Sequence, residues 1–274
     1  MQQNITNIKT NINRSVGTIQ LQEHTNGIVT ACGSLGSKFE MLYKREMYSE
    51  IAQDIVSSAL NKLACTGAKL IGFSEYIKTD SKEIAEIIER EISSEIKKYN
   101  CEEMSVKIET GNTGINNSVC GFALGINPIE KEEIVSGDIV VGLASNGLHF
   151  NGYEYLEGFD ERDIIETLKP AYNYYNDIME LYKNSKIKLG VNITKGGIYH
   201  CLNKVLPKGL TADLNLKHIL KQPVFEKLRE TTGNEFYSLF NAGIGYCLIT
   251  DRASNEIFFE ECQKYDPIVL GVIQ

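Results

Sequence analysis

The chain has 274 residues, which is enough for two domains of ordinary size or one large domain. Hydrophobic residues make up 42% and charged residues 23% of the chain, as in globular rather than disordered proteins. The formal net charge of −8 argues against nucleic acid as the main partner, because phosphate backbones are bound by a surplus of Lys and Arg. No apolar run reaches about 18 residues and residues 1–14 are polar, so we expect neither a membrane span nor a secretory signal. Seven cysteines without a CxxC pair favour reduced thiols and a cytoplasmic location.

The first half of the chain predicts an α+β domain over residues 26–128, after a loose arm over residues 1–25. Helices are indicated by apolar residues that recur every four positions, and strands by short apolar or alternating runs. The βαβαββ order suggests helices on one face of a sheet, and the last two strands are expected to pair with each other. In chain order we predict a strand at Gly27–Ala31, a helix at Met47–Ala64, a strand at Lys69–Ile77, a helix from Ser81, and strands at Met104–Glu109 and Val119–Ile126.

The second half predicts an α/β domain over residues 135–274, after a linker at Pro128 and Glu130–Glu133. Strands and helices alternate along it. We predict a strand at 138–144, helices within Tyr153–Lys183 and Gly196–Val205, a turn at Pro207–Gly209, helical pieces around 215–231, a strand at Gly243–Ile249, a helix at Ala253–Lys264 and a strand at Pro267–Ile273.

The strongest site signal is the loop that follows the strand run Ile139–Leu143. Small residues form a turn there, and one imidazole and one amide stand just ahead of a predicted helix. Backbone N–H groups and polar tips converge at such strand exits, and a neutral imidazole can donate to or accept from a sugar, amide or phosphate oxygen. We therefore predict a binding role for His149 rather than a structural one. The predicted substrate-binding residues of this loop are Ser145, Asn146, Gly147, His149, Asn151 and Gly152.

A second candidate segment is Thr194–Gly197, which opens a helix after a short strand. Free N–H groups and the helix dipole make such ends possible anion sites, so Thr194, Gly196 and Gly197 are predicted to bind phosphate. Asn241 lies in a later turn and is predicted to line the same pocket.

Three ordered blocks resemble the signatures of one family. Gly137–Tyr153 closely resembles the GDxxxGLxSSGxHSNGY signature of aminoimidazole ribonucleotide synthetase, the cyclo-ligase of purine biosynthesis. Asn192–Ile198 and Phe240–Gly245 resemble that family's HITGGGI and FNMGIG blocks at the expected spacing. The resemblance covers about residues 15–274. It implies a two-domain synthetase-type fold, with an N-terminal domain whose sheet pairs with its copy in a homodimer and a C-terminal α/β sandwich domain.

The glycine loop Gly33–Lys38 is weak evidence by itself, because a plain strand-to-helix turn is commoner and the loop is not a Walker A motif. It resembles the family's SGTDGVGTK, which binds nucleotide phosphates and metal at a dimer interface. Under the resemblance, His149 and Lys38 are the predicted catalytic residues. The resemblance also implies Glu109 as a metal ligand, although an exposed strand-end carboxylate fits equally well. The nucleotide-binding residues that it implies are Gly33, Gly36, Ser37, Lys38, Asn61, Glu109 and Thr110.

Two departures from the family pattern bear on ATP and Mg²⁺, the cofactors that the resemblance implies. Cys32 stands where the family has an Asp, and Lys62 replaces the Asp of a VND motif that handles the metal. In addition, residues 1–14 contain no counterpart of the family's YxxAGVDI segment. Selenophosphate synthetase fits less well, because it needs a reactive Cys in an N-terminal glycine loop that this chain lacks. Thiamine-monophosphate kinase and the hydrogenase-maturation member fit less well, because they lack this combination of HxNGY and FNxGIG blocks.

Two hypotheses about function follow. The first is a divergent phosphoribosylformylglycinamidine cyclo-ligase, in which ATP phosphorylates the formyl oxygen of formylglycinamidine ribonucleotide and the amidine nitrogen closes the ring. The second is a non-catalytic or regulatory relative that keeps the fold and the dimer and binds a phosphorylated metabolite. Both predict a phosphorylated small molecule as the partner.

Overall fold

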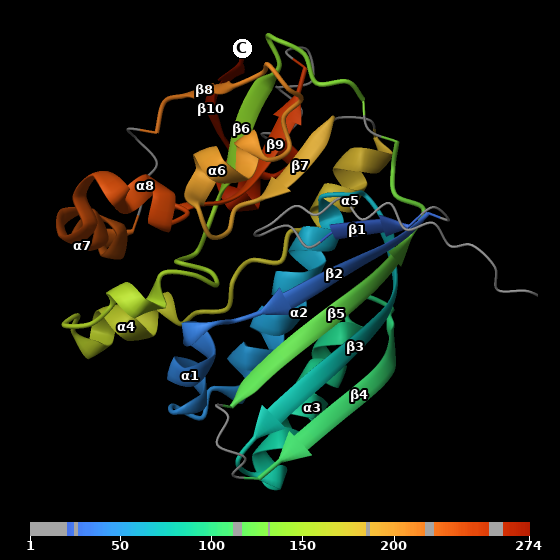
Figure 1. Cartoon of the computed structure of the whole chain (residues 1–274), viewed down its shortest axis with the longest axis vertical. Helices are drawn as coiled ribbons and strands as arrows, with labels where there is room; N and C mark the ends of the chain where they lie inside the picture. The colour runs from blue at the N-terminus through green and yellow to red at the C-terminus, as the bar shows by residue number, and fades with distance from the viewer. Residues whose placement is uncertain are drawn as a thin grey trace, which may run out of the picture.

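The computed structural model describes residues 21–24, 27–111, 117–130, 132–184, 187–216, 222–251 and 260–274. Two five-stranded sheets lie one above the other, the first formed by the N-terminal half and the second by the C-terminal half (Figure 1). The strand order is β1-β2-β5-β3-β4 in the first sheet and β7-β9-β6-β10-β8 in the second. The predicted fold class is confirmed: a mixed two-sheet fold with helices on one face of the N-terminal sheet.

The N-terminal half follows the predicted βαβαββ order. Ser81 caps the second long helix, since its hydroxyl accepts a hydrogen bond from the N–H of Ile84. Both long helices pack on one face of the sheet and bury the apolar stripe that the four-residue spacing predicted. The elements are β1 (Leu21–His24), β2 (Ile28–Ser34), α1 (Ser37–Tyr43), α2 (Tyr48–Ala64), β3 (Lys69–Thr79), α3 (Lys82–Lys97), β4 (Glu102–Thr110) and β5 (Ser118–Ile126).

Three predictions for this half were wrong. β4 and β5 do not pair with each other: β4 pairs in parallel with β3 at the edge of the sheet, and β5 lies between β2 and β3. β5 suits a central position because Gly121 and Gly125 leave room for Phe73 and Leu63. The arm predicted over residues 1–25 contains strand β1, which pairs with β2. The loop predicted over Gly33–Lys38 ends two residues early, because helix α1 begins at Ser37.

The C-terminal half surrounds two buried central strands, β6 (Ile139–Ala144) and β9 (Ile244–Thr250), in which nearly every residue is buried. The strands predicted at 138–144, Gly243–Ile249 and Pro267–Ile273 are present. Most of the predicted helix Ala253–Lys264 lies outside the described residues. The other elements are η1 (Tyr153–Tyr155), α4 (Glu161–Thr167), α5 (Tyr175–Lys183), β7 (Leu189–Asn192), α6 (Gly197–Asn203), β8 (Ala212–Leu214), α7 (Pro223–Thr232), η2 (Gly233–Glu235), α8 (Phe236–Leu239), η3 (Gln263–Tyr265) and β10 (Ile268–Ile273).

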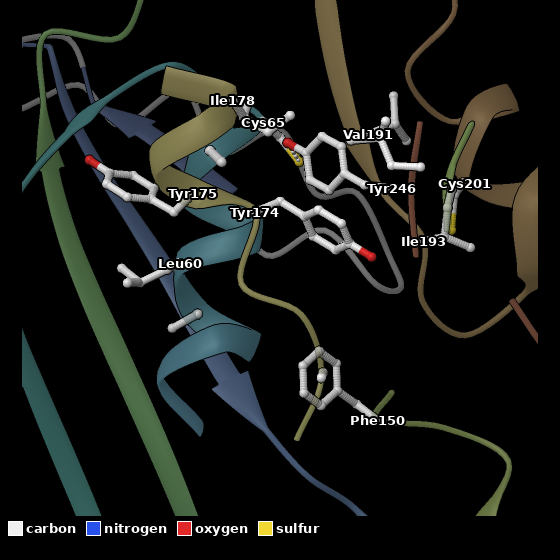
Figure 2. Packing of buried hydrophobic residues seen from close by; sticks show 14 of the residues in the cluster. Leu60, Cys65, Phe150, Tyr174, Tyr175, Ile178, Val191, Ile193, Cys201 and Tyr246 are labelled. Atoms are coloured by element: carbon white, nitrogen blue, oxygen red, sulfur yellow. Dashed lines mark hydrogen bonds between the residues drawn. The ribbon is translucent and has the colours of Figure 1, made fainter. Parts of the chain in front are cut away.

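The two halves share a continuous buried contact around the start of α5. Tyr174 points toward the second sheet and its neighbour Tyr175 toward the first (Figure 2). The Tyr175 hydroxyl donates to the carbonyl of Ala68 at 3.1 Å and accepts from the N–H of Leu70 at 2.7 Å. On the other side, the Tyr246 hydroxyl lies 3.3 Å from the Cys65 sulfur at the end of α2. These polar anchors hold the end of α2 and the start of β3 against α5 and β9.

Candidate functional site

A cavity of about 210 Å³ lies between the two halves of the chain. Cys32 and Ser34 are two positions apart on β2, and Ser58 and Lys62 are four positions apart on α2, so each pair presents side chains on one face of its element. The loops after β6 and β7 close the opposite side. The lining residues are Cys32, Ser34, Ser58, Lys62, Phe150, Asn151, Thr194 and Lys195.

The wall of this cavity carries positive charge and hydroxyl groups. Lys62 comes from the N-terminal half and Lys195 from the C-terminal half, and no Asp or Glu stands among the described residues that line the cavity. The Lys62 ammonium donates a hydrogen bond to the carbonyl of Cys32 at 2.6 Å. Burial lowers the pKa of Lys62, and the neighbouring thiols, Cys32 first, oppose that shift. The arrangement suits an anionic ligand.

Lys38 is not part of this wall. Its side chain is fully buried, and its ammonium lies 2.6 Å from a carboxylate oxygen of Asp54 and donates to the carbonyl of Lys169 at 2.9 Å. The second oxygen of Asp54 accepts from the N–H of Ala171 at 2.8 Å. Burial lowers the pKa of Lys38, and Asp54 opposes the shift. Lys38, predicted as a catalytic and nucleotide-binding cation, therefore forms an ion pair with Asp54 that joins α1 and α2 to the loop before α5.

Three asparagines predicted to bind ligand instead tie loops together. Asn61 donates to the carbonyl of Tyr172 and accepts from the N–H of Tyr174, both at 2.8 Å. Asn146 donates to the carbonyl of Pro170 at 2.5 Å and accepts from the N–H of Tyr172 at 3.2 Å. Asn241 donates to the carbonyl of Gly147 at 2.9 Å and accepts from the N–H of Gly243 at 3.1 Å. Each amide satisfies backbone groups of a turn, which leaves little capacity for a ligand.

His149 lies behind the cavity rather than in its wall. The residue is 2% exposed, and neither ring nitrogen has a hydrogen-bond partner within the described part of the chain. Burial, and secondarily the charge of Lys38, lower the pKa of His149 to about 3. A left-handed backbone, with φ of 58°, places the ring beside Phe150 and Tyr174. The two residues that follow it, Phe150 and Asn151, are the ones that reach the cavity.

The glycines of the predicted site serve close packing. A side chain at Gly152 would collide with the ring of Phe240, and one at Gly197 would lie 1.9 Å from the carbonyl oxygen of Tyr237. Gly196 precedes α6, a helix of seven residues that packs against α8. Of the segment Thr194–Gly197, the structure brings Thr194 and Lys195 to the cavity.

The remaining predicted residues lie elsewhere. Glu109 and Thr110 end the edge strand β4, where the Glu109 carboxylate accepts a hydrogen bond from the Tyr76 hydroxyl at 2.9 Å, and neither lines the cavity of its own chain. The Ser37 hydroxyl donates to Glu154 at 3.2 Å. Gly33 sits against α2, where an added side chain would lie 2.8 Å from the N–H nitrogen of Ala59, and Ser145 is buried. Gly36 and Gly147, both with left-handed φ, shape the turns.

Sequence reasoning did not predict Ser34, Ser58, Phe150 or Lys195 as site residues, and treated Cys32 and Lys62 only as departures. The spacing of these residues along their strand or helix was the sequence signal that could have found them. The pairs Cys32/Ser34 and Ser58/Lys62 each share one face of a strand or helix, beside the glycine loop that had already drawn attention.

The fold and the site define a two-domain synthetase-type protein with a cationic cavity between its halves. A family described as "AIR synthase related protein, C-terminal domain" matches residues 135–274. Because this match covers more than half of the chain, the chain belongs to the AIR synthase family.

Individual relatives agree with this assignment. The "Phosphoribosylformylglycinamidine cyclo-ligase" of Alkaliphilus metalliredigens (strain QYMF) is 28% identical over 262 residues, covering 84% of this chain and 74% of the relative. Among solved structures, a HypE–HypF complex has a TM-score of 0.68 at 15% identity, covering 93% of this chain and 86% of that chain. The hydrogenase maturation protein HypE in complex with ATP has a TM-score of 0.67 at 11% identity, covering 90% of this chain and 76% of that chain. These structures share the fold.

One further observation concerns membranes. None of the described helices combines the length and the apolar character needed to cross a bilayer.

Proposed function

We propose that the cavity between the two halves binds the phosphate of a phosphorylated ribosyl metabolite. The observation that carries this proposal is that two lysines, Lys62 from the first half of the chain and Lys195 from the second, line one cavity. Ser34, Ser58 and Thr194 also line the cavity and add hydroxyl groups to its wall, of which that of Ser58 donates to the carbonyl of Ser34 at 3.3 Å. At about 4 Å and an effective dielectric near 20, each ammonium interacts with a unit negative charge by roughly 4 kcal/mol before desolvation is counted.

The rest of the wall supports a sugar-bearing ligand. Asn151 offers an amide that can bond to a ribose hydroxyl, and Phe150 offers an apolar ring surface. Formylglycinamidine ribonucleotide is the first candidate, because the chain is 28% identical to a protein named phosphoribosylformylglycinamidine cyclo-ligase. We propose that residues 26–128 and 135–274 act as the two domains that meet around this ligand.

The second candidate function is ATP-dependent ring closure of that compound. It is favoured by the name of the relative and by the ATP complex of a protein with the same fold. The engagement of Lys38 with Asp54 and of Asn61 with backbone groups counts against it, because both were expected to contact nucleotide. If ring closure occurs, nucleotide binding must rely on other groups of the glycine loop or on a second copy of the chain.

Calorimetric titration with formylglycinamidine ribonucleotide tests the first proposal. Wild-type protein is expected to bind, and Lys195→Met is expected to bind about tenfold or more weakly, a loss of about 1.4 kcal/mol. Lys208→Met is the matched control, because Lys208 is exposed and lies outside the cavity lining. Equal affinity of both variants would refute the assignment of the site. Release of ADP when ATP and magnesium are added separates the second candidate from binding alone.

We also propose that the protein is a homodimer through the outer face of the first sheet. Four large apolar side chains on β2, β3, β4 and β5 are exposed between 36% and 58%. On β2 and β5 exposed and buried positions alternate, and α2 and α3 cover one face of this sheet (Figure 1). Exposed large apolar side chains gathered on one sheet are typical of interaction surfaces. The four residues are Ile28, Ile71, Met104 and Phe122.

A further inference from the structure

The donor groups of the cavity do not fit the divalent metal that the family resemblance implies. Magnesium prefers carboxylate, phosphate and water oxygens in octahedral geometry. The lining set offers hydroxyls, one amide, one thiol and two ammonium groups. Within the described ranges, no group of three or more His, Cys, Asp or Glu side chains could hold a metal ion. A cation at this position would meet the positive charge of Lys62.

The setting of Lys62 differs from that of the other buried lysine nearby. Lys38 is neutralised by Asp54 at 2.6 Å. Among the described residues, the groups that oppose the lowering of the Lys62 pKa are thiols, and none of them is a carboxylate. Within the described part of the chain the Lys62 ammonium donates one hydrogen bond, to the neutral carbonyl of Cys32, and an ammonium has three N–H donors. Two donors therefore remain for a ligand in the cavity.

The position of Lys62 is fixed by its helix. It lies in the last turn of the 17-residue helix α2, and its ammonium is tethered to the backbone of β2, so the charge is held at the cavity wall. Lys195 approaches from the second half of the chain, on the loop between β7 and α6. An anion placed between them would touch both halves at once.

We propose that the Lys62 ammonium supplies the positive charge that a divalent ion would otherwise bring, so that this cavity holds a phosphate-type dianion without magnesium. The inference rests on the proposed anion-binding function, and adds that the binding of the anion does not require a metal ion. A fixed ammonium acts as a compact point charge and, unlike a metal ion, is not removed by chelators.

The direct test is titration of the wild-type protein with ribose 5-phosphate and with inorganic phosphate, in excess EDTA and again in magnesium chloride. We expect affinities that agree within about threefold between the two conditions, and a loss of about tenfold or more in Lys62→Met without metal. Lys208→Met is expected to bind as the wild type does. Binding that requires magnesium, or equal binding by Lys62→Met and Lys208→Met, would overturn the inference.

A second variant reverses the proposed substitution. Cys32→Asp/Lys62→Asp places two carboxylates at the wall, and carboxylates suit Mg²⁺ and Mn²⁺. We expect this variant to bind Mn²⁺, detected by electron paramagnetic resonance, and to lose metal-free phosphate binding, while the wild type binds no Mn²⁺ at this site. The inference would be contradicted if the wild type bound Mn²⁺ and variants of the phosphate site lost that binding.

The outcomes separate the two proposals. If the wild type binds neither probe in either condition, the proposed anion-binding function fails and the inference fails with it. If the wild type binds only with magnesium, the function stands and the inference alone fails. The wild-type comparison decides this even if Lys62→Met does not fold.

Discussion

Replacing His149 with Phe is expected to change the pH dependence of stability. The imidazole is 2% exposed without a hydrogen-bond partner for either nitrogen among the described residues, and burial lowers its pKa from 6.5 to about 3. Between these two pH values the unfolded chain binds a proton that the folded chain excludes, so stability falls as the pH falls below about 6.5. Each pH unit corresponds to about 1.4 kcal/mol, which gives about 2 kcal/mol at pH 5 and an upper bound near 5 kcal/mol at pH 3.

The assay is denaturant unfolding of wild type and His149→Phe at pH 7 and pH 5. Phe has a similar volume and suits the aromatic neighbours Phe150 and Tyr174, so the variant should fold. We expect the difference in unfolding free energy to move by about 2 kcal/mol in favour of the variant between pH 7 and pH 5. An unchanged difference would show that the folded imidazole titrates like a solvated one, and that His149 reaches water or a ligand.

Three further predictions concern the rest of the molecule. Burial raises the pKa of Glu75 to about 8, so stability is lost as the pH rises from 4.5 towards 8, and Glu75→Gln should unfold at a higher denaturant concentration than wild type at pH 8 but not at pH 4.5. Lys38→Met leaves Asp54 buried without its partner and should cost about 3–5 kcal/mol of unfolding free energy, most of which the double variant Lys38→Met/Asp54→Leu should recover in the same assay. Phe122→Lys places a charge on the exposed face of β5 and should convert a dimer to a monomer in analytical ultracentrifugation, whereas a wild-type monomer at tens of micromolar would contradict the proposed interface.

The order of elements in the N-terminal half could be predicted because it depends on local periodicity. Isoleucines at every fourth position specify one face of α3, and Ser81 specifies where that helix begins. The pairing of β4 and β5 could not be predicted in the same way, because β5 pairs with strands that lie far away in the sequence. Sequence neighbours pair often enough to make the hairpin a natural expectation, and here tertiary packing favoured another order.

The sequence blocks located the loops of the site more reliably than its side chains. The loop after β6 and the segment after β7 do reach the cavity, through Asn151 and Thr194. Asn146, in the loop after β6, and Asn241, in the turn before β9, bond instead to backbone groups of separate segments: Asn146 donates to the carbonyl of Pro170 and Asn241 to that of Gly147. Local sequence does not reveal such long-range partners, so an amide that holds a turn resembles an amide that binds a ligand.

The central claim is that the cavity between the two halves binds phosphate, and a crystal structure of the wild type with ribose 5-phosphate in excess EDTA tests it most directly. We predict a phosphate oxygen within about 3 Å of the Lys62 ammonium nitrogen, with Lys195 on the opposite side. Phosphate bound away from both lysines, or a cavity without phosphate in crystals grown at saturating ligand, would contradict the claim.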